Sequence, residues 1–144
     1  MEWTRPQYKV TTDVNALDLD AIYNFISQDA YWSRGIPRAT FEKSVANSLC
    51  FGLFKTEEQI GFARVVSDFA TIAYLGDVFV LPNFRGRGLS KWLMECITSH
   101  PQLQNLRRWI LVTSDAHGLY RKFEFTELAK PQNYMERHDP EVYA

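Results

Sequence analysis

Apolar residues recur along the first third of the chain at spacings that predict one strand and two helices. Residues 8–12 alternate between polar and apolar side chains, as a half-buried strand does. The apolar positions of residues 17–26 recur at helical spacing. Residues 27–37 carry aromatic and turn-forming side chains and are predicted to form a loop. A second short helix is predicted over residues 39–46.

The middle of the chain predicts a hairpin, a further strand and an amphipathic helix. Two apolar runs, residues 49–54 and 60–66, flank the charged turn at residues 55–58, and this pattern is typical of a β-hairpin. Another apolar run covers residues 73–81. Residues 89–99 then place their apolar side chains on one helical face, with a proline just beyond the end.

The last third predicts a strand at residues 109–113, a short helix at 116–123 and a final strand at 125–128, followed by a polar tail. This order of elements predicts an α/β domain, of the α+β kind, with a mixed central sheet flanked by helices. Because the helix at 89–99 connects the strands at 73–81 and 109–113, we expect these two strands to be parallel.

Composition places the chain among ordinary globular proteins. Its 144 residues are enough to bury one hydrophobic core, so residues 1–144 are expected to form a single domain. A net charge of -1 without runs of like charge argues against a nucleic-acid partner. No stretch is apolar for long enough to span a membrane, and Cys50 and Cys96 resemble buried thiols of a reducing compartment, so we expect a cytoplasmic protein. The histidines and cysteines do not have the spacing of metal ligands.

The most informative segment joins the strand at 73–81 to the helix at 89–99. It reads Val78-Phe79-Val80-Leu81-Pro82-Asn83-Phe84-Arg85-Gly86-Arg87-Gly88-Leu89-Ser90. Its glycines permit a turn that presents free backbone N–H groups at the positive end of the helix dipole, and both favour a bound phosphate. An ATP-binding loop is excluded because no Gly-Lys-Ser/Thr follows. A dinucleotide fingerprint is excluded because Lys91 stands where Gly or Ala is required.

This turn resembles the phosphate-binding motif of the GNAT superfamily of acetyl-CoA-dependent N-acetyltransferases, Arg/Gln-x-x-Gly-x-Gly/Ala. Arg85 and Gly88 match the motif. Ser90 occupies the last position, where the family has Gly or Ala, and serine is also a small residue.

A second segment, Thr113 to Phe125, is similar to the superfamily pattern Asn-x-x-Ala-x-x-Leu-Tyr-x-Lys-x-Gly-Phe. Thr113 replaces the Asn, which weakens a side-chain contact to the pantetheine arm. Glu124 replaces the Gly, in a turn that we expect to lie away from the chemistry. Together with the order of elements, the resemblance covers residues 8–128 and implies the GNAT-like acyl-CoA N-acyltransferase fold.

The resemblance implies that acetyl-CoA is bound as the acyl donor. The N–H groups of residues 86–90 would hold its pyrophosphate, the backbone of residues 78–80 would pair with the pantetheine arm as a strand does, and the acyl end would enter a gap between the strands at 73–81 and 109–113. The implied cofactor-binding residues are Val78, Phe79, Val80, Arg85, Gly86, Arg87, Gly88, Leu89, Ser90, Lys91 and Thr113.

Two residues are candidates for the chemistry of direct acetyl transfer. Tyr120 keeps its proton at neutral pH and can give it to the departing thiolate, although it can also be a core aromatic residue. Asp77 is a carboxylate within an apolar strand, on the side of Phe79. It can act as a general base, hold a cationic substrate, or form a salt bridge with Arg64 or Arg108.

Tyr31 and Trp32 lie in the loop where this superfamily builds its acceptor pocket, and their rings can bind an ammonium group or pack in the core. The sequence therefore predicts an N-acetyltransferase acting on a primary amine, with a small molecule as the acceptor. Two alternatives stay open: a non-catalytic acyl-CoA-binding sensor or interaction module, and a protein or peptide N-acetyltransferase. A homodimer is compatible with the resemblance.

Overall fold

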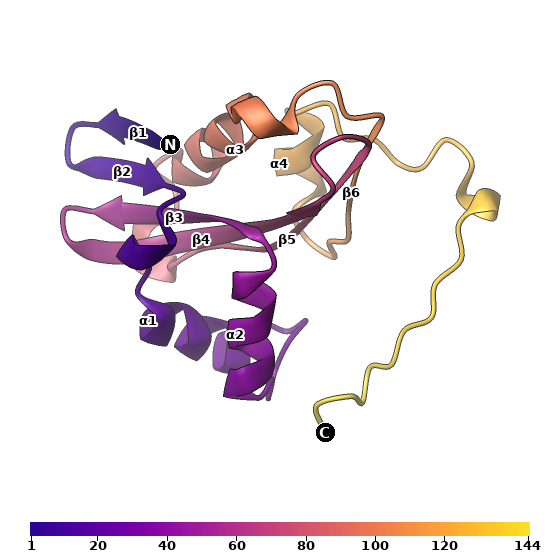
Figure 1. The fold of residues 1–144 in the computed structure, drawn as a ribbon, viewed down its shortest axis with the longest axis horizontal. Helices are drawn as coiled ribbons and strands as arrows, with labels where there is room; N and C mark the ends of the chain where they lie inside the picture. Colours follow the sequence, from indigo (N-terminus) through magenta and orange to yellow (C-terminus); the bar gives the residue numbers. More distant parts are fainter.

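The computed structural model describes residues 1–144. Its centre is a six-stranded sheet, in which the strands lie side by side in chain order from β1 to β6 (Figure 1). The strands are β1 (Glu2–Arg5), β2 (Tyr8–Thr11), β3 (Leu49–Lys55), β4 (Glu58–Ser67), β5 (Ile72–Val80) and β6 (Arg108–Leu111). All neighbours pair antiparallel except β5 and β6, which are parallel. The parallel pairing predicted from the connecting helix is confirmed.

Helices cover both faces of the sheet (Figure 1). They are α1 (Leu19–Asn24), which continues into a π-helix (Phe25–Asp29), α2 (Arg38–Ala46), α3 (Leu89–Ser99) and α4 (His117–Arg121). Helices α1 and α2 lie against one face, whereas α3 and α4 lie against the other. No helix has both the length and the apolar character that crossing a bilayer requires.

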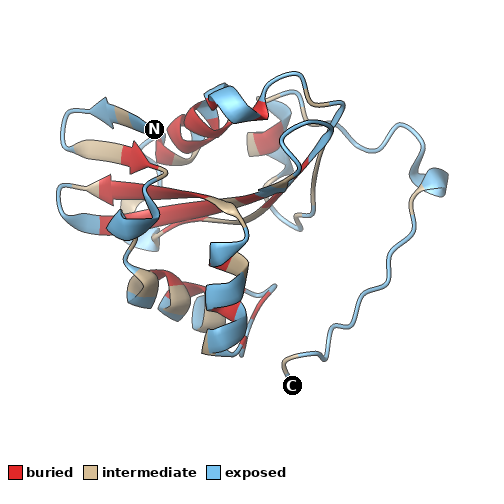
Figure 2. Cartoon of the chain, viewed as in Figure 1, coloured by how far each residue is buried: buried red, intermediate tan, exposed pale blue.

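The core consists of two layers of buried side chains, one on each face of the sheet (Figure 2). The larger layer joins the sheet to α3 and includes Leu53, Val65, Leu93 and Tyr120. The smaller layer joins the sheet to α1 and α2. Strand β4 is covered by core side chains on both faces of the sheet, so most of its residues are apolar. This continuous apolar run is the signal from which the sequence analysis predicted the strand.

Two predictions about the ends of the sheet are wrong. Strand β1 was not predicted because three of its four residues are exposed, so it carries almost no alternation of apolar side chains. The strand predicted at residues 125–128 does not form. The N–H group of Phe125 instead closes the end of α4 by donating to the carbonyl of Tyr120 at 3.2 Å, and Glu127 forms an ion pair with Arg121.

The turn after α4 is a Schellman motif, in which two N–H groups beyond the helix reach back to its last carbonyls. Phe125 donates to Tyr120, five residues back, and Glu124 donates to Arg121, three residues back, both at 3.2 Å. Glu124 has a φ of 70°, in the left-handed region that this motif reserves for glycine. The ring of Phe125 packs edge-on against Tyr120. The turn that we expected to lie away from the chemistry thus contacts the candidate residue Tyr120 through the backbone and the ring of Phe125.

We expect Glu124→Gly to stabilise the protein by about 1 kcal/mol, because glycine adopts a positive φ without the steric cost of a Cβ atom. Urea denaturation measures this as a higher midpoint with an unchanged slope. Glu124→Ala is the matched control, since it removes the same carboxylate but keeps the Cβ atom. Equal stability of the two variants would contradict an origin in backbone strain.

Candidate active site

The site begins where strands β5 and β6 part. Their parallel pairing starts with Ile72 opposite Arg108 and ends with Leu75 opposite Leu111. Beyond Leu75, β5 continues to Val80 and still pairs with β4, but no strand lies on its other side. The predicted gap between these two strands is confirmed.

Backbone groups of β5 face this gap. The N–H group of Leu81 donates to the carbonyl of Ile60 in β4 at 2.8 Å. Because the bonded pairs of an antiparallel ladder alternate along the strand, the amides of Val78 and Val80 point away from β4 and toward the gap. The carbonyl of Val80 already accepts a hydrogen bond from Nε of Arg85 at 2.9 Å. The N–H groups of both valines and the carbonyl of Val78 thus form an open edge for an extended ligand.

Phe79 lies differently from its two neighbours. The same alternation turns its amide toward β4. Its ring stacks on Phe25 with the centroids 4.0 Å apart, in the core layer beneath α1. The structure thus brings Val78 and Val80 to the gap but not Phe79, although the sequence analysis had grouped the three.

The open edge of β5 leads to the turn that begins α3. Gly86 and Gly88 have φ values of 79° and 74°, and no atom lies within 4 Å of the place where either would carry a Cβ. The positive φ values favour glycine at both positions. The open space beside both residues leaves room for a ligand to approach the backbone. The N–H groups of residues 86–91 find no acceptor within the protein, and the first helical bond runs from Trp92 to Gly88. This row of free N–H groups at a helix N-terminus fits a phosphate group.

Side chains add positive charge around the turn. Arg85 is held by its bond to Val80, and Arg87 makes two hydrogen bonds, of 3.3 and 3.4 Å, to uncharged oxygens. Lys91 is exposed and Ser90 is half-buried, whereas the side chain of Leu89 is buried in the core. Leu89 can therefore contribute only its backbone N–H group to a bound anion.

Asp77 lies in a β-bulge on the opposite face of the sheet from α3. The pairing register of β4 and β5 shifts between Phe62 and Arg64, so β5 holds one extra residue there. Asp77 has a φ of 54°, which marks it as the bulged residue. The bulge turns its carboxylate toward the layer of α1 and α2, the side on which the ring of Phe79 lies.

Both oxygens of the Asp77 carboxylate are engaged. One accepts from Nε of Arg64 and the other from Nε1 of Trp32, each at 2.8 Å. The side chains of Arg64 and Asp77 are 19% and 11% exposed, so water screens this ion pair little. Arg64 also donates to the hydroxyl of Ser48 at 3.2 Å. Of the two salt-bridge partners considered from the sequence, Arg64 is the one present, because Arg108 lies over the ring of Tyr134.

The loop that carries Tyr31 and Trp32 spans the site from the bulge to the segment before α4. The two rings meet edge-on with their centroids 5.1 Å apart, and they are 52% and 42% exposed, so neither is a core residue. Trp32 reaches Asp77, whereas the hydroxyl of Tyr31 accepts from the backbone N–H of Ser114 at 3.1 Å. The loop therefore closes one side of the site.

Tyr120 lies at the inner end of this site. Its side chain is 8% exposed and belongs to the larger core layer. Its hydroxyl makes no hydrogen bond within the protein. Because every fully buried side-chain oxygen and nitrogen of the protein has a hydrogen-bond partner, the hydroxyl oxygen of Tyr120 must be part of the small exposed area. The pKa of Tyr120 is raised to about 12, mainly by burial of the phenol and to a smaller extent by the negative charges of Asp115 and of Tyr31 when ionised. The group thus holds its proton across the neutral range.

Thr113 uses its hydroxyl within its own segment. Its hydroxyl accepts hydrogen bonds from the N–H groups of Ala116 and Asp115, at 3.1 and 3.4 Å, and so shapes the start of α4. Two residues of the site were not assigned there from the sequence. Ser114 acts through its backbone, which leaves no signal in a side-chain motif, and Arg64 was considered only as a partner for Asp77.

Comparison with known proteins agrees with this geometry. The family model of the acetyltransferase (GNAT) domain matches residues 46–127. A candidate acetyltransferase of Gibberella zeae is 32% identical over an alignment of 140 positions that covers 83% of this chain and 79% of that protein.

Solved structures give the same result. A candidate GNAT-family acetyltransferase from Xanthomonas campestris is 51% identical and superposes with a TM-score of 0.94 over 98% of this chain and 99% of its own. An acetyltransferase structure from Clostridium acetobutylicum with acetyl-CoA is 16% identical and has a TM-score of 0.66 over 96% of each chain, so it shares the fold. The open strand edge, the free amides of the glycine turn and these relatives lead to one conclusion: the chain belongs to the GNAT family of acetyltransferases.

Proposed function

We propose that this protein is an N-acetyltransferase that moves an acetyl group from acetyl-CoA directly to the primary amine of a small molecule. One observation carries the proposal. A continuous row of free backbone groups runs from the open edge of β5 at Val78 and Val80 to the amides of residues 86–91. An extended arm that ends in a pyrophosphate is complementary to such a row.

Acetyl-CoA would supply an acetyl group activated as a thioester. The attacking amine forms a C–N bond at the carbonyl carbon while the C–S bond breaks. Tyr120 gives the proton of its hydroxyl to the departing sulfur, and the proton lost from the amine returns to the phenolate through water. A pKa of about 12 suits this task, because the hydroxyl is protonated before the reaction and the phenolate is readily reprotonated afterwards.

Asp77 serves in this proposal as a positioning residue. Both of its oxygens already accept hydrogen bonds, one from a guanidinium group and one from the indole of Trp32. It therefore holds the loop that bears the two exposed aromatic rings. Both rings are exposed, and an aromatic ring can bind a cationic amine. The hydrogen bond from Ser114 to Tyr31 ties the loop down on this side, which supports a small acceptor.

A non-catalytic acyl-CoA-binding module is the alternative of another class. The free hydroxyl of Tyr120 in the site favours the enzyme, because a binding module has no use for a protonated phenol there. Release of free CoA with small amines, and its absence with peptides, is the result that separates the small-molecule enzyme from the module and from a protein acetyltransferase.

Gly88→Glu should weaken acetyl-CoA binding by at least about a hundredfold, because it places a carboxylate among amides that would hold a phosphate. Isothermal titration calorimetry measures the affinity. Gly88→Ala is the control, since it imposes the same strain at positive φ without the charge. Equal losses in the two variants would count against an anion at this turn.

Tyr120→Phe should lower kcat about a hundredfold or more while the Kd for acetyl-CoA stays the same, because only the proton donor is removed. Steady-state kinetics and a thermal melt measure the two effects separately. In the wild type, loss of the tyrosine proton should not reduce the rate between about pH 7 and about pH 9, since its pKa lies well above this range. Unchanged kcat in Tyr120→Phe would rule out the role as general acid.

Trp32→Phe and Asp77→Asn should each raise the KM for the amine about tenfold, the effect of losing one hydrogen bond to a charged group worth about 1.5 kcal/mol. Neither should change the shape of the kcat pH profile if Asp77 only positions the loop. If Asp77 is the general base, Asp77→Asn alone should lose the acidic limb of that profile, and Trp32→Phe should keep it.

A further inference from the structure

Helices α1 and α2 leave part of their face of the sheet uncovered. The register of β4 and β5 places Val66 opposite Tyr74, so their side chains lie on one face, together with that of Ile72. Ala73 and Leu75 alternate with these residues and point into the layer beneath α3. The side chains of Val66, Ile72 and Tyr74 are 43%, 41% and 39% exposed. We call these three residues the apolar floor, because adjoining exposed apolar side chains mark a surface that binds another molecule.

The apolar floor is continuous with the candidate active site. Gly76 lies opposite Arg64 in the register, and both face the same side as Tyr74. A Cβ atom on Gly76 would lie 3.2 Å from the ring of Tyr74 and 3.9 Å from Nη2 of Arg64. Because Arg64 binds Asp77 and Asp77 binds Trp32, a series of neighbouring side chains leads from the floor to the aromatic loop.

One nitrogen of Arg64 has no partner within the protein. Its Nε donates to Asp77 and its Nη1 to Ser48, whereas Nη2 makes no hydrogen bond. Since no fully buried side-chain nitrogen lacks a partner, Nη2 is accessible to solvent. Its N–H groups therefore lie at the surface beside Gly76, and a guanidinium group with free N–H groups binds carboxylates well.

This free donor lies close to the gap between β5 and β6. Only the bulged residue Asp77 separates Gly76 from Val78, whose N–H group faces the gap, and two residues of a strand rise about 7 Å at most. A thioester at Val78 and the Nη2 atom beside Gly76 are thus near enough to contact one small molecule. An amine and a carboxylate attached to the same carbon atom fit this spacing.

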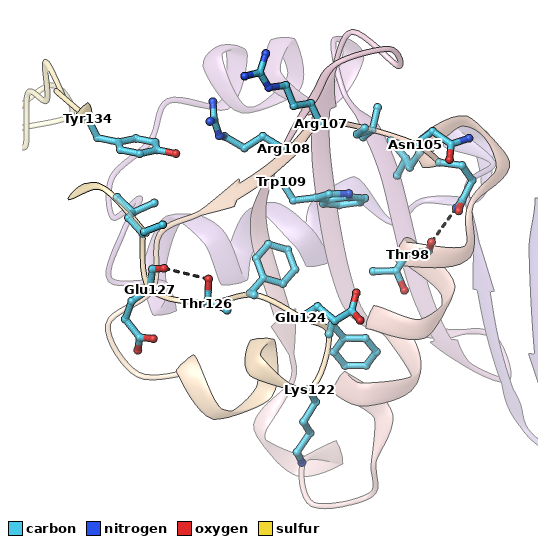
Figure 3. A pocket seen from close by; sticks show the side chains of 17 residues that line it. Thr98, Asn105, Arg107, Arg108, Trp109, Lys122, Glu124, Thr126, Glu127 and Tyr134 are labelled. Atoms are coloured by element: carbon cyan, nitrogen blue, oxygen red, sulfur yellow. Dashed lines mark hydrogen bonds between the residues drawn. The ribbon is translucent and has the colours of Figure 1, made fainter. Parts of the chain in front are cut away.

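The cavity between β6 and the segment after α4 does not share these features. It has a volume of about 670 Å³ and is lined by Trp109, Glu124 and Glu127, among others (Figure 3). Trp109 packs against the core layer beneath α3, and neither Arg64 nor Asp77 reaches this cavity. The free donor and the apolar floor therefore belong to the acceptor side of the site alone.

We propose that the acceptor is an α-amino acid with an apolar or aromatic side chain, an inference that rests on the proposed function. Its amine faces the thioester beside the rings of Tyr31 and Trp32, its carboxylate accepts from Nη2 of Arg64, and its side chain lies on the apolar floor. The amine loses a proton and forms the C–N bond, the C–S bond breaks, and the sulfur takes up a proton. The products are an N-acetyl amino acid and CoA.

Binding of three related ligands tests this assignment without turnover. With CoA bound, isothermal titration calorimetry should give L-phenylalanine a Kd at least about tenfold below those of phenethylamine, which lacks the carboxylate, and glycine, which lacks the side chain. Equal affinity for L-phenylalanine and phenethylamine would overturn the role of Arg64. Equal affinity for L-phenylalanine and glycine would overturn the role of the apolar floor.

Turnover separates this inference from the proposed function. Release of CoA from acetyl-CoA with phenethylamine but not with L-phenylalanine would overturn the amino-acid acceptor and leave the acetyltransferase intact. Tight binding of L-phenylalanine without any release of CoA would support the binding site and count against the enzyme.

Gly76→Asp tests the carboxylate position without removing Arg64, whose loss would also release Asp77. Gly76 does not have a positive φ, so the backbone accepts a side chain there. The new carboxylate lies beside Nη2 and should raise the Kd of L-phenylalanine at least about tenfold relative to that of phenethylamine. Gly76→Asn is the matched control, since it adds the same volume without the charge. An equal change of this ratio in both variants would contradict a carboxylate at Nη2.

Tyr74→Ala tests the apolar floor. It removes the exposed ring beside Gly76 and should raise the Kd of L-phenylalanine about tenfold, while the Kd of glycine stays the same. A thermal melt checks that the variant is folded. An unchanged Kd of L-phenylalanine would show that the side chain of the acceptor does not lie on this floor.

Discussion

The site depends on the ion pair between Arg64 and Asp77. One extra residue in β5, Asp77, reverses the side of the sheet toward which the following side chains point. Asp77 adopts a left-handed backbone conformation there, which is strained for a residue other than glycine. The nearly buried pair, closed at 2.8 Å, holds the bulge in place from the neighbouring strand. Just before the bulge, β5 gives up its pairing with β6, and just after it the valine amides are free. The bulge therefore joins an open strand edge on one side to a fixed aromatic loop on the other.

The backbone of the proposed donor half of the site could be predicted from local sequence, because that half is made of consecutive residues. A strand, two glycines at positive φ and a helix follow one another, and their backbone geometry depends on residue type at those positions. The acceptor half was predicted only in outline. Tyr31 and Asp77 are far apart in the chain, and their contacts with Ser114 and Arg64 arise from tertiary packing that no spacing along the sequence records. The bulge at Asp77 could not be predicted from local sequence, since an aspartate in an apolar strand is compatible with a general base, a substrate anchor or an ion-pair partner.

The same reasoning explains the misassigned end of the chain. Residues 125–128 have the composition of a strand, but a Schellman turn uses the N–H group of Phe125 that a sheet would need. The family pattern placed Glu124 in a turn, but glutamate ordinarily avoids a positive φ, so the sequence did not indicate that this turn would exclude a strand after it. Because the chain turns there, β6 stays at the edge of the sheet, and the residues after Phe125 are exposed except Tyr134 and Tyr143.

The open space around Gly86 and Gly88 leaves the backbone of the glycine turn accessible to a ligand, and this distinguishes the turn from the side of the site that bears Tyr31 and Trp32. Amides of the main chain are present whatever side chain a codon specifies, so substitutions in this turn at positions other than the two glycines leave its N–H groups chemically unchanged. The acceptor side consists of side chains on three separate segments, and a single substitution there alters its shape and charge. Under the proposed function, such a division would let a lineage acquire new acceptors by single substitutions while its acyl donor stays the same.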